Sequence, residues 1–186
     1  RFSEPIQTSY RNHIIYAHPP PAGGASVLLE GLNILENFQV EELGPNSGRF
    51  LHLFAEALQR GHMDRSRFMG DPLFYDVPIK KIISKERAKS LAKGINQNSV
   101  TPAGNLNPDS LFNESENTTH YSIIDKFGNA VSTTYTLGYS FGSGVTIPGT
   151  GILLDNQMNN FAYQYGNPEV ISRFASIGNK FEPGKR

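Results

Sequence analysis

The stretch Thr118–Leu137, TTHYSIIDKFGNAVSTTYTL, decides the fold of the second half of the chain. Apolar and polar residues alternate on both sides of a turn-forming segment, Asp125–Asn129. Successive side chains of a strand point to opposite faces, so this period of two predicts a β-hairpin. On its second strand, one face holds the hydroxyl groups of Ser132, Thr134 and Thr136.

Upstream of the hairpin, the apolar residues recur with the helical period of about 3.6. Three helices are predicted, and their boundaries follow from glycine and serine signals. They begin after Gly24, at Ser47 and at Ser84, and they end at Gly44–Pro45, Gly61 and Gly94, respectively. Residues 98–117 are rich in Asn, Ser, Pro and Gly and have the composition of a linker. Helices followed by strands predict the α+β class.

Three other segments are less regular. Residues 1–12 are polar and show no period, and residues 63–83 are expected to form loop and short turns. Five glycines between Gly138 and Gly151 predict a glycine-rich loop, and Ile152–Leu154 is expected to form a short strand after it.

The composition excludes several classes of function. The chain has 186 residues, with 17 Lys and Arg against 17 Asp and Glu, so its formal net charge is zero. A neutral chain gives no electrostatic case for a nucleic acid as a partner. The absence of cysteine excludes thiolate metal ligands and a cysteine nucleophile. The five histidines lack metal-ligand spacing, so neither a metal nor another cofactor is expected.

Thr118 stands where the linker ends and the regular strand begins. Taken alone, Thr118 and Thr119 are β-branched residues that suit the start of a strand. A threonine freed at a new N-terminus, however, carries a nucleophilic hydroxyl and an α-amine that can take its proton. The junction therefore makes an N-terminal threonine nucleophile plausible.

Longer motifs support that chemistry. Those downstream of the junction are Thr118–Ser122, Gly128–Val131, Thr133–Leu137, Gly151–Leu154 and Asn156–Met158. Those upstream are Pro19–Pro21, Leu32–Phe38, Asp64–Ser66 and Gly70–Pro72. In this order they resemble the end of the large subunit and the start of the small subunit of a γ-glutamyltranspeptidase. The resemblance covers nearly the whole chain from about Tyr10 onward.

The resemblance implies a fold and a reaction. The family consists of N-terminal nucleophile hydrolases with a four-layer α-β-β-α sandwich, of which this chain would form a part. It implies that a proenzyme cleaves itself at Asn117–Thr118 and that Thr118 then forms an acyl-enzyme with γ-glutamyl amides such as glutathione. Thr136 matches the hydroxyl that orients the nucleophile, and Gln157 matches a substrate-binding amide.

Two positions depart from the family pattern. Asn160 stands where the family has an aspartate that faces the substrate α-ammonium, and Gly138 stands where it has an asparagine for the same group. Both positions are therefore expected to lie in the substrate pocket but to bind that ammonium weakly. The arginine that binds the substrate α-carboxylate is expected before Arg1, and the serine and glycine pairs of the site are expected after Arg186.

The resemblance also implies the organisation and the partners. Residues 1–117 would be the C-terminal part of the large subunit, ending in the linker 98–117, and residues 118–186 the N-terminal part of the small subunit, with a lid-like segment. The partners would be a glutathione-like γ-glutamyl substrate, an amine or water as acceptor, and the remainder of both subunits. A periplasmic or secreted location is implied.

Two other functions stay open. A related cephalosporin-acylase-like amidase would cleave amides that lack the α-ammonium. A non-catalytic relative would use the fold for binding or structure. This segment alone is expected to be catalytically inert in either case.

Overall fold

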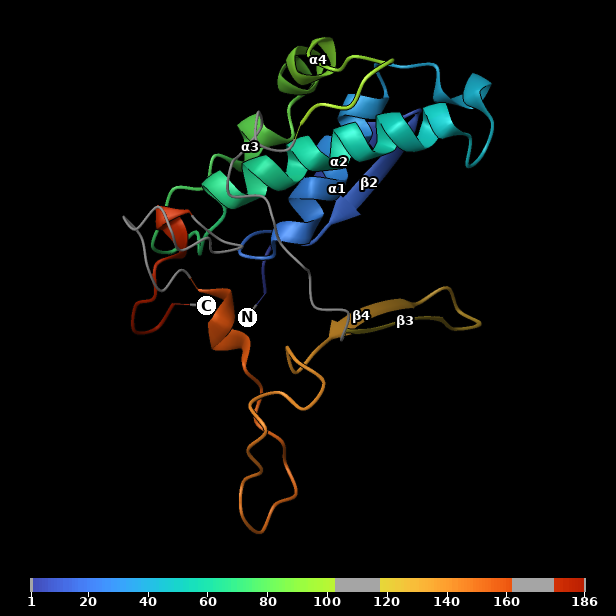
Figure 1. Cartoon of the computed structure of the whole chain (residues 1–186). Helices are drawn as coiled ribbons and strands as arrows, with labels where there is room; N and C mark the ends of the chain where they lie inside the picture. Colours follow the sequence, from blue (N-terminus) through green and yellow to red (C-terminus); the bar gives the residue numbers. More distant parts are fainter. Residues whose placement is uncertain (1, 103–117, 162–175, 186) are drawn as a thin grey trace. The chain divides into compact units, whose positions relative to one another are not determined.

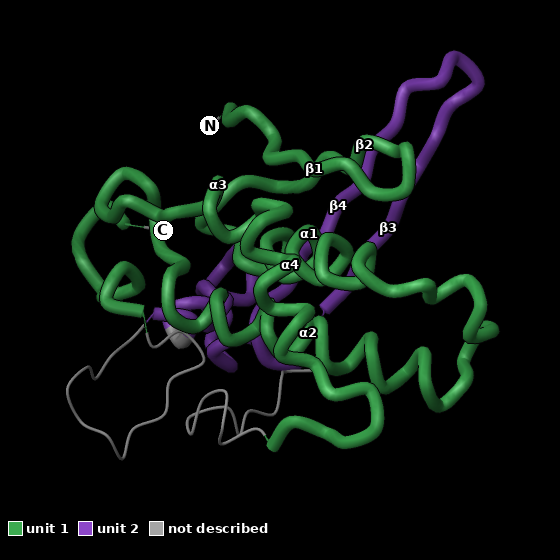
Figure 2. The backbone as a smooth tube through the Cα atoms, turned by 90° about the horizontal axis from the view of Figure 1, so that it is seen from above, with its two compact units in different colours: residues 1–111, 162–186 green, residues 112–161 purple. Residues whose placement is uncertain are grey.

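The computed structural model describes residues 2–102, 118–161 and 176–185 of the chain (Figure 1). The chain divides into two compact units, residues 1–111 with 162–186 and residues 112–161 (Figure 2). The first unit contains a β-hairpin together with the α-helices α1 (Gly23–Leu35), α2 (Gly48–Phe68), α3 (Ile79–Ile82) and α4 (Lys85–Lys93). The second contains another β-hairpin. Helices and strands in separate segments confirm the α+β class.

The first unit opens with a hairpin that the sequence did not predict. Strand β1 (Ile6–Tyr10) pairs antiparallel with β2 (His13–Ala17). The two residues between them, Arg11 and Asn12, have φ of 48° and 68°, the left-handed conformation that a two-residue turn needs. The expectation of an unpatterned start and of helices before strands is therefore wrong, because a turn without glycine gives a weak sequence signal.

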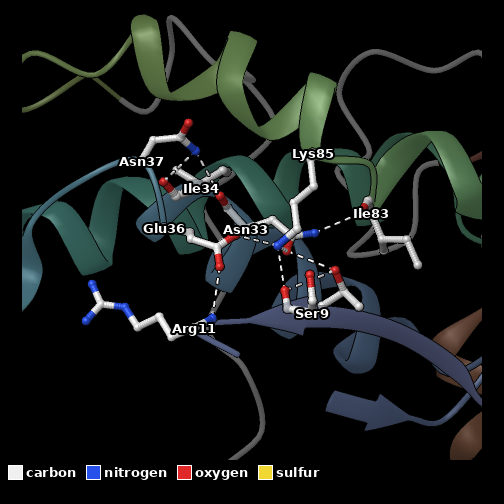
Figure 3. A network of polar contacts seen from close by, with 9 residues as sticks. Ser9, Arg11, Asn33, Ile34, Glu36, Asn37, Ile83 and Lys85 are labelled. Atoms are coloured by element: carbon white, nitrogen blue, oxygen red, sulfur yellow. Dashed lines mark hydrogen bonds and ion pairs between the residues drawn. The ribbon is translucent and has the colours of Figure 1, made fainter. Parts of the chain in front are cut away.

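A network of polar contacts joins this hairpin to two helices (Figure 3). Lys85 in α4 (Lys85–Lys93) donates to the Ser9 carbonyl at 2.5 Å, to Asn33 Oδ1 at 2.6 Å and to Glu36 Oε2 at 2.5 Å. Asn33 in α1 (Gly23–Leu35) also donates to the carbonyl of Ile83 at 2.7 Å. The hydrogen bond from Lys85 lowers the pKa of Glu36. One ammonium group thus ties β1, α1 and α4 together.

The second helix is longer than predicted. Helix α2 spans Gly48–Phe68 and passes through Gly61, where the sequence predicted its end. A methyl group built on Gly61 would lie 3.1 Å from the Cα and the carbonyl oxygen of Val27 in α1. This glycine therefore allows two helices to pack closely and does not end one. Residues 63–68 are helical for the same reason, so the predicted loop is wrong there.

The starts of α2 and α4 and the end of α4 follow the predicted signals, but α1 ends at Leu35, well before the predicted stop at Gly44 and Pro45. The hydroxyl of Ser47 accepts from Phe50 N at 3.2 Å, and that of Ser84 accepts from Arg87 N at 3.2 Å. Each bond satisfies an N–H of the first helical turn. Gly94 follows the last residue of α4, as predicted, and a single turn, α3 (Ile79–Ile82), lies in the predicted loop. The main apolar core joins α1, α2 and α4 through Ile34, Leu35, Leu53, Ala57, Ala88, Ala92 and Ile95.

A pair of carboxyl groups is buried beside this core. Glu30 in α1 and Asp64 in α2 are both fully buried. Arg87 in α4 forms ion pairs with both, and its Nε lies 3.3 Å from Glu30 Oε1. Burial and the neighbouring Asp64 carboxylate raise the pKa of Glu30 to about 9. Two carboxyl groups beside one guanidinium therefore keep one proton at neutral pH.

The second unit is built on the predicted hairpin. Strand β3 (Thr119–Ile124) pairs antiparallel with β4 (Ala130–Tyr135). The carboxylate of Asp125 accepts from Phe127 N at 2.8 Å and from Asn129 N at 2.9 Å, which closes the turn. The strand predicted at 152–154 is only a single bridge, between Thr146 and Leu153. The glycine-rich loop leads to a 3-10 helix, η2 (Gln157–Asn160).

We predict that Glu30→Gln stabilises the full-length protein increasingly as the pH rises. Because its pKa is raised on folding, the contribution of Glu30 to the free energy of unfolding is fully present below about pH 4.5 and is lost progressively up to about pH 9. A glutamine side chain is uncharged at every pH, so the variant takes up no proton at this position when it folds. The gain in free energy of unfolding over the wild type should therefore grow by roughly 1 kcal/mol per pH unit between pH 5 and pH 8.

Urea unfolding at several pH values measures this difference. Glu86→Gln, which removes an exposed carboxyl from the first turn of α4, is the matched control and should show no such trend. A pH-independent effect of Glu30→Gln would contradict the shared proton.

Candidate active site

The β3–β4 ladder ends next to two predicted catalytic residues. Its last pair is Thr119 with Tyr135, and Thr118 and Thr136 are the adjoining residues outside the ladder. Continued by one residue, the alternation of side chains would assign both to the face that carries His120 and Thr134. Thr118 is exposed. The other cleavage-site residue, Asn117, lies outside the described residues.

The remaining predicted site residues gather at the end of β4. Gly138 N donates to Thr136 Oγ1 at 3.0 Å, and Gln157 Nε2 donates to the carbonyl of Thr136 at 3.3 Å. Asn160 Nδ2 donates to Gln157 Oε1. Four residues proposed from motifs far apart in the sequence are thus joined by one chain of hydrogen bonds.

The backbone before η2 fixes this cluster in place. Asn156 N donates to the carbonyl of Leu137 at 2.9 Å, which holds the start of η2 against the chain leaving β4. The carboxylate of Asp155 accepts from Gln157 N at 2.8 Å and is exposed. Asp155 therefore acts as a turn residue.

Position 138 requires glycine for two reasons, its backbone conformation and the space taken by a neighbouring side chain. Its φ of +92° is a conformation that side chains disfavour. A methyl group built there would collide with Asn156 Oδ1 and lie 3.0 Å from Asn156 Cγ. That Oδ1 accepts from Tyr139 N at 3.0 Å, so Asn156 is held in place. The side-chain amide of Asn156 thus fills the space that a side chain at 138 would need.

His120 is a polar residue of this face that was not among the predicted site residues. Its Nδ1 lies 2.6 Å from Thr134 Oγ1, and its Nε2 lies 3.2 Å from Ser122 Oγ and 3.1 Å from Ser132 Oγ. The period of two already placed these side chains on one face. Their mutual hydrogen bonds depend on the cross-strand register, which only the structure gives.

An ion pair in the first unit holds the chain where the linker begins. Glu56 and Arg60 form a buried pair at 2.6 Å. Glu56 also accepts from Thr101 N and from Thr101 Oγ1, each at 2.7 Å, and Arg60 Nη2 donates to the carbonyl of Gly94 at 3.1 Å. Burial raises the pKa of Glu56, but the bonds from Thr101 and Arg60 outweigh it, so its pKa is lowered. The carboxylate is therefore charged and anchors residue 101.

The part of the chain that the structure describes shows no group of three or more His, Asp or Glu side chains placed to hold a metal ion. Among the same residues, no helix has the length and apolarity that a membrane span requires.

Comparison with known proteins identifies the family. The family profile described as Gamma-glutamyltranspeptidase matches residues 1–186. The chain belongs to the γ-glutamyltranspeptidase family. It is 41% identical over 183 residues to a protein of Escherichia coli (strain K12) named glutathione hydrolase proenzyme, covering 98% of this chain and 32% of that protein. The family resemblance drawn from the motifs is thus confirmed.

Two solved structures extend the comparison. The γ-glutamyltranspeptidase of Helicobacter pylori is 35% identical, with a TM-score of 0.55 over 61% of this chain and 33% of that chain. The cephalosporin acylase of Bacillus halodurans is 28% identical, with a TM-score of 0.73 over 98% of this chain and 30% of that chain. The chain spans about a third of the length of the relatives that it matches.

We predict that Gly138→Ala destabilises the full-length protein more than Gly128→Ala does. Both glycines have positive φ, +92° and +84°, so both substitutions carry a backbone cost of about 1–2 kcal/mol. Only Gly138 meets a neighbour, because nothing lies within 4 Å of a methyl group built on Gly128. Overpacking against Asn156 should add roughly 1–3 kcal/mol.

The free energies of unfolding in urea measure the two costs. Adding Asn156→Gly should remove the excess cost at Gly138 and leave the cost at Gly128 unchanged. Equal costs for the two single variants would show that Asn156 does not occupy this space.

Proposed function

We propose that the full-length protein is a self-cleaving γ-glutamyltransferase and hydrolase that acts on γ-glutamyl amides such as glutathione through an acyl-enzyme on Thr118. The observation that carries this proposal is the β3–β4 ladder, whose last pair, Thr119 with Tyr135, directly adjoins the hydroxyl-bearing residues Thr118 and Thr136 where the linker meets the strand. Membership of the family and the proenzyme name of the E. coli relative support it.

The proposed maturation is an intramolecular acyl transfer. The Thr118 hydroxyl adds to the Asn117 carbonyl, the Asn117–Thr118 C–N bond breaks, and the hydroxyl proton passes to the released α-amine. Water then hydrolyses the ester, which leaves a carboxylate on Asn117 and restores the Thr118 hydroxyl. The product carries nucleophile and base on the same residue, because its α-amine has a pKa near neutrality.

Turnover repeats this chemistry on a substrate. The Thr118 α-amine takes the hydroxyl proton while the oxygen attacks the γ-glutamyl carbonyl, and the leaving amine takes that proton as its bond breaks. Water or an acceptor amine then attacks the acyl-enzyme. Thr136 orients the nucleophile, and Gln157 and Asn160 line the acyl pocket beside Gly138. The hydrogen bonds among these four residues would hold the pocket before substrate binds.

The proposal includes the organisation of the protein. Residues 1–117 form the end of a large subunit, residues 118–186 the start of a small one, and the two belong to a four-layer sandwich. The remainder of both subunits would complete the site.

A second candidate function is an acylase that cleaves amides without an α-ammonium. Two observations favour it. The pocket residues at 138 and 160 carry no charge, and the cephalosporin acylase of B. halodurans aligns with 98% of this chain at a TM-score of 0.73.

The first prediction from this proposal concerns maturation. Full-length protein should cleave itself at Asn117–Thr118 without added protease, and Thr118→Ala should stay uncut because it lacks the hydroxyl. Thr136→Val should slow cleavage by about ten- to hundredfold, since it keeps the shape but loses the orienting hydroxyl. Denaturing gels and intact mass give the time course.

Thr119→Ala is the matched control, because Thr119 is the adjacent threonine and lies on the opposite face of β3. It should cleave at the wild-type rate. Normal cleavage of Thr118→Ala at the same bond would exclude the mechanism.

The second prediction concerns the acyl donor. A carboxylate bonded to an ammonium contributes about 1.5–3 kcal/mol, so Asn160→Asp should raise the kcat/KM ratio for γ-glutamyl over glutaryl anilides by roughly tenfold or more. Asn160→Ala removes the amide without adding charge and should not raise that ratio. A wild type that already prefers the γ-glutamyl donor several hundredfold, with no gain from Asn160→Asp, would contradict the altered pocket.

A further inference from the structure

The segment 176–185 packs directly on the loop that follows α2, within the first unit (Figure 1). Its 3-10 helix η3 (Ile177–Asn179) is capped by Ser176, whose hydroxyl accepts from Gly178 N at 3.0 Å. Ser176 and Gly178 are both buried. In the proposed organisation, this segment belongs to the small subunit and the loop belongs to the large one.

Two glycines make the closest approach. A methyl group built on Gly70 would collide with the carbonyl oxygen of Gly178 and lie 2.6 Å from its carbonyl carbon. A methyl group built on Gly178 would lie 2.5 Å from Cγ and 2.8 Å from Cε1 of the Tyr75 ring. Neither glycine has a positive φ. Space, and not backbone conformation, therefore requires glycine at both positions.

The loop that receives the segment is held in one shape. The amides of Phe74 and Tyr75 donate to the Asp71 carbonyl at 2.9 and 3.0 Å. The Asp71 carboxylate accepts from Leu73 N at 3.0 Å, and Asp71 is fully buried. Tyr75 thus meets Gly178 from a fixed turn, so added bulk at Gly178 cannot be absorbed cheaply.

A second contact lies at the end of the segment. Lys185 Nζ lies 5.6 Å from the centroid of the Phe74 ring and 3.6 Å from Glu182 Oε1, and its side chain is only 2% exposed. A buried ammonium needs such partners, and a ring face and a carboxylate both stabilise it. The segment is therefore attached at both ends of its described length.

We propose that Gly70, Tyr75 and Phe74 form a docking surface for residues 176–185 that holds the two cleaved fragments of the protein together. The inference rests on the proposed cleavage at 117–118. Before cleavage the contact is intramolecular, so the connecting chain keeps the local concentration of the segment high. After cleavage this help is lost, and the fragments stay joined through packing of this kind.

The test uses full-length protein that has matured, with Gly70→Ala as the variant. The methyl group forces the segment away from the loop, so the urea concentration at which the two fragments separate on size exclusion should fall by roughly 0.5–1 M. Gly48→Ala is the matched control, because nothing lies within 4 Å of a methyl group built there. Equal midpoints for Gly70→Ala and Gly48→Ala would overturn the proposal.

The uncut variant Thr118→Ala allows the docking contact to be tested without cleavage, which separates this proposal from the proposed function. A wild type that stays uncut would exclude the proposed function and the role of the surface in joining fragments. The docking contact itself is then tested in the uncut chain by combining Gly178→Ala with Tyr75→Leu. Because the two side chains collide only when both are present, the pair should cost less free energy of unfolding than the sum of the single changes. Additive costs would exclude the contact.

Discussion

The register of β3 against β4 is the constraint on which the candidate site depends. Because side chains alternate along a strand, a slip of one residue would move every hydroxyl of one strand to the opposite face. The register is pinned on both faces. His120 bonds to Thr134 on one, and the rings of Tyr121 and Tyr135 meet edge to face at 6.4 Å on the other. These contacts fix which residues of the two strands face one another, up to the last pair of the ladder, Thr119 with Tyr135.

The sequence predicted the fold correctly where a local signal decides the structure. The period of two gave the second hairpin, and Ser47 and Ser84 cap helices because a hydroxyl meets an N–H three residues away. It failed where a distant residue decided. Glycine often ends a helix, but glycine is needed at position 61 because the backbone of Val27 in another helix lies too close for a side chain. The first hairpin was missed because its turn at Arg11 and Asn12 contains no glycine, and because the contacts of Thr8 and Ser9 are with Asn33 and Lys85, which are far along the chain.

The same division applies to the site. Thr136, Gly138, Gln157 and Asn160 came from motifs, and motifs preserve spacing along the chain. The structure joins these residues by hydrogen bonds, which spacing alone could not reveal. The contacts of Asn156 and His120 were not predicted, because each depends on a neighbour. That neighbour is a glycine 18 residues away for Asn156 and a hydroxyl on the facing strand for His120.

The position of Thr118 at the edge of the ladder explains how one residue could serve in both proposed reactions. Thr118 precedes the first paired residue of β3, so breaking its bond to the linker would remove no pair of the β3–β4 ladder. The strand would therefore hold the hydroxyl in the same place before and after cleavage. The released amine would gain freedom only at the chain end, beside its own hydroxyl. A nucleophile one residue before a registered strand would thus need no rearrangement of the hairpin between maturation and turnover.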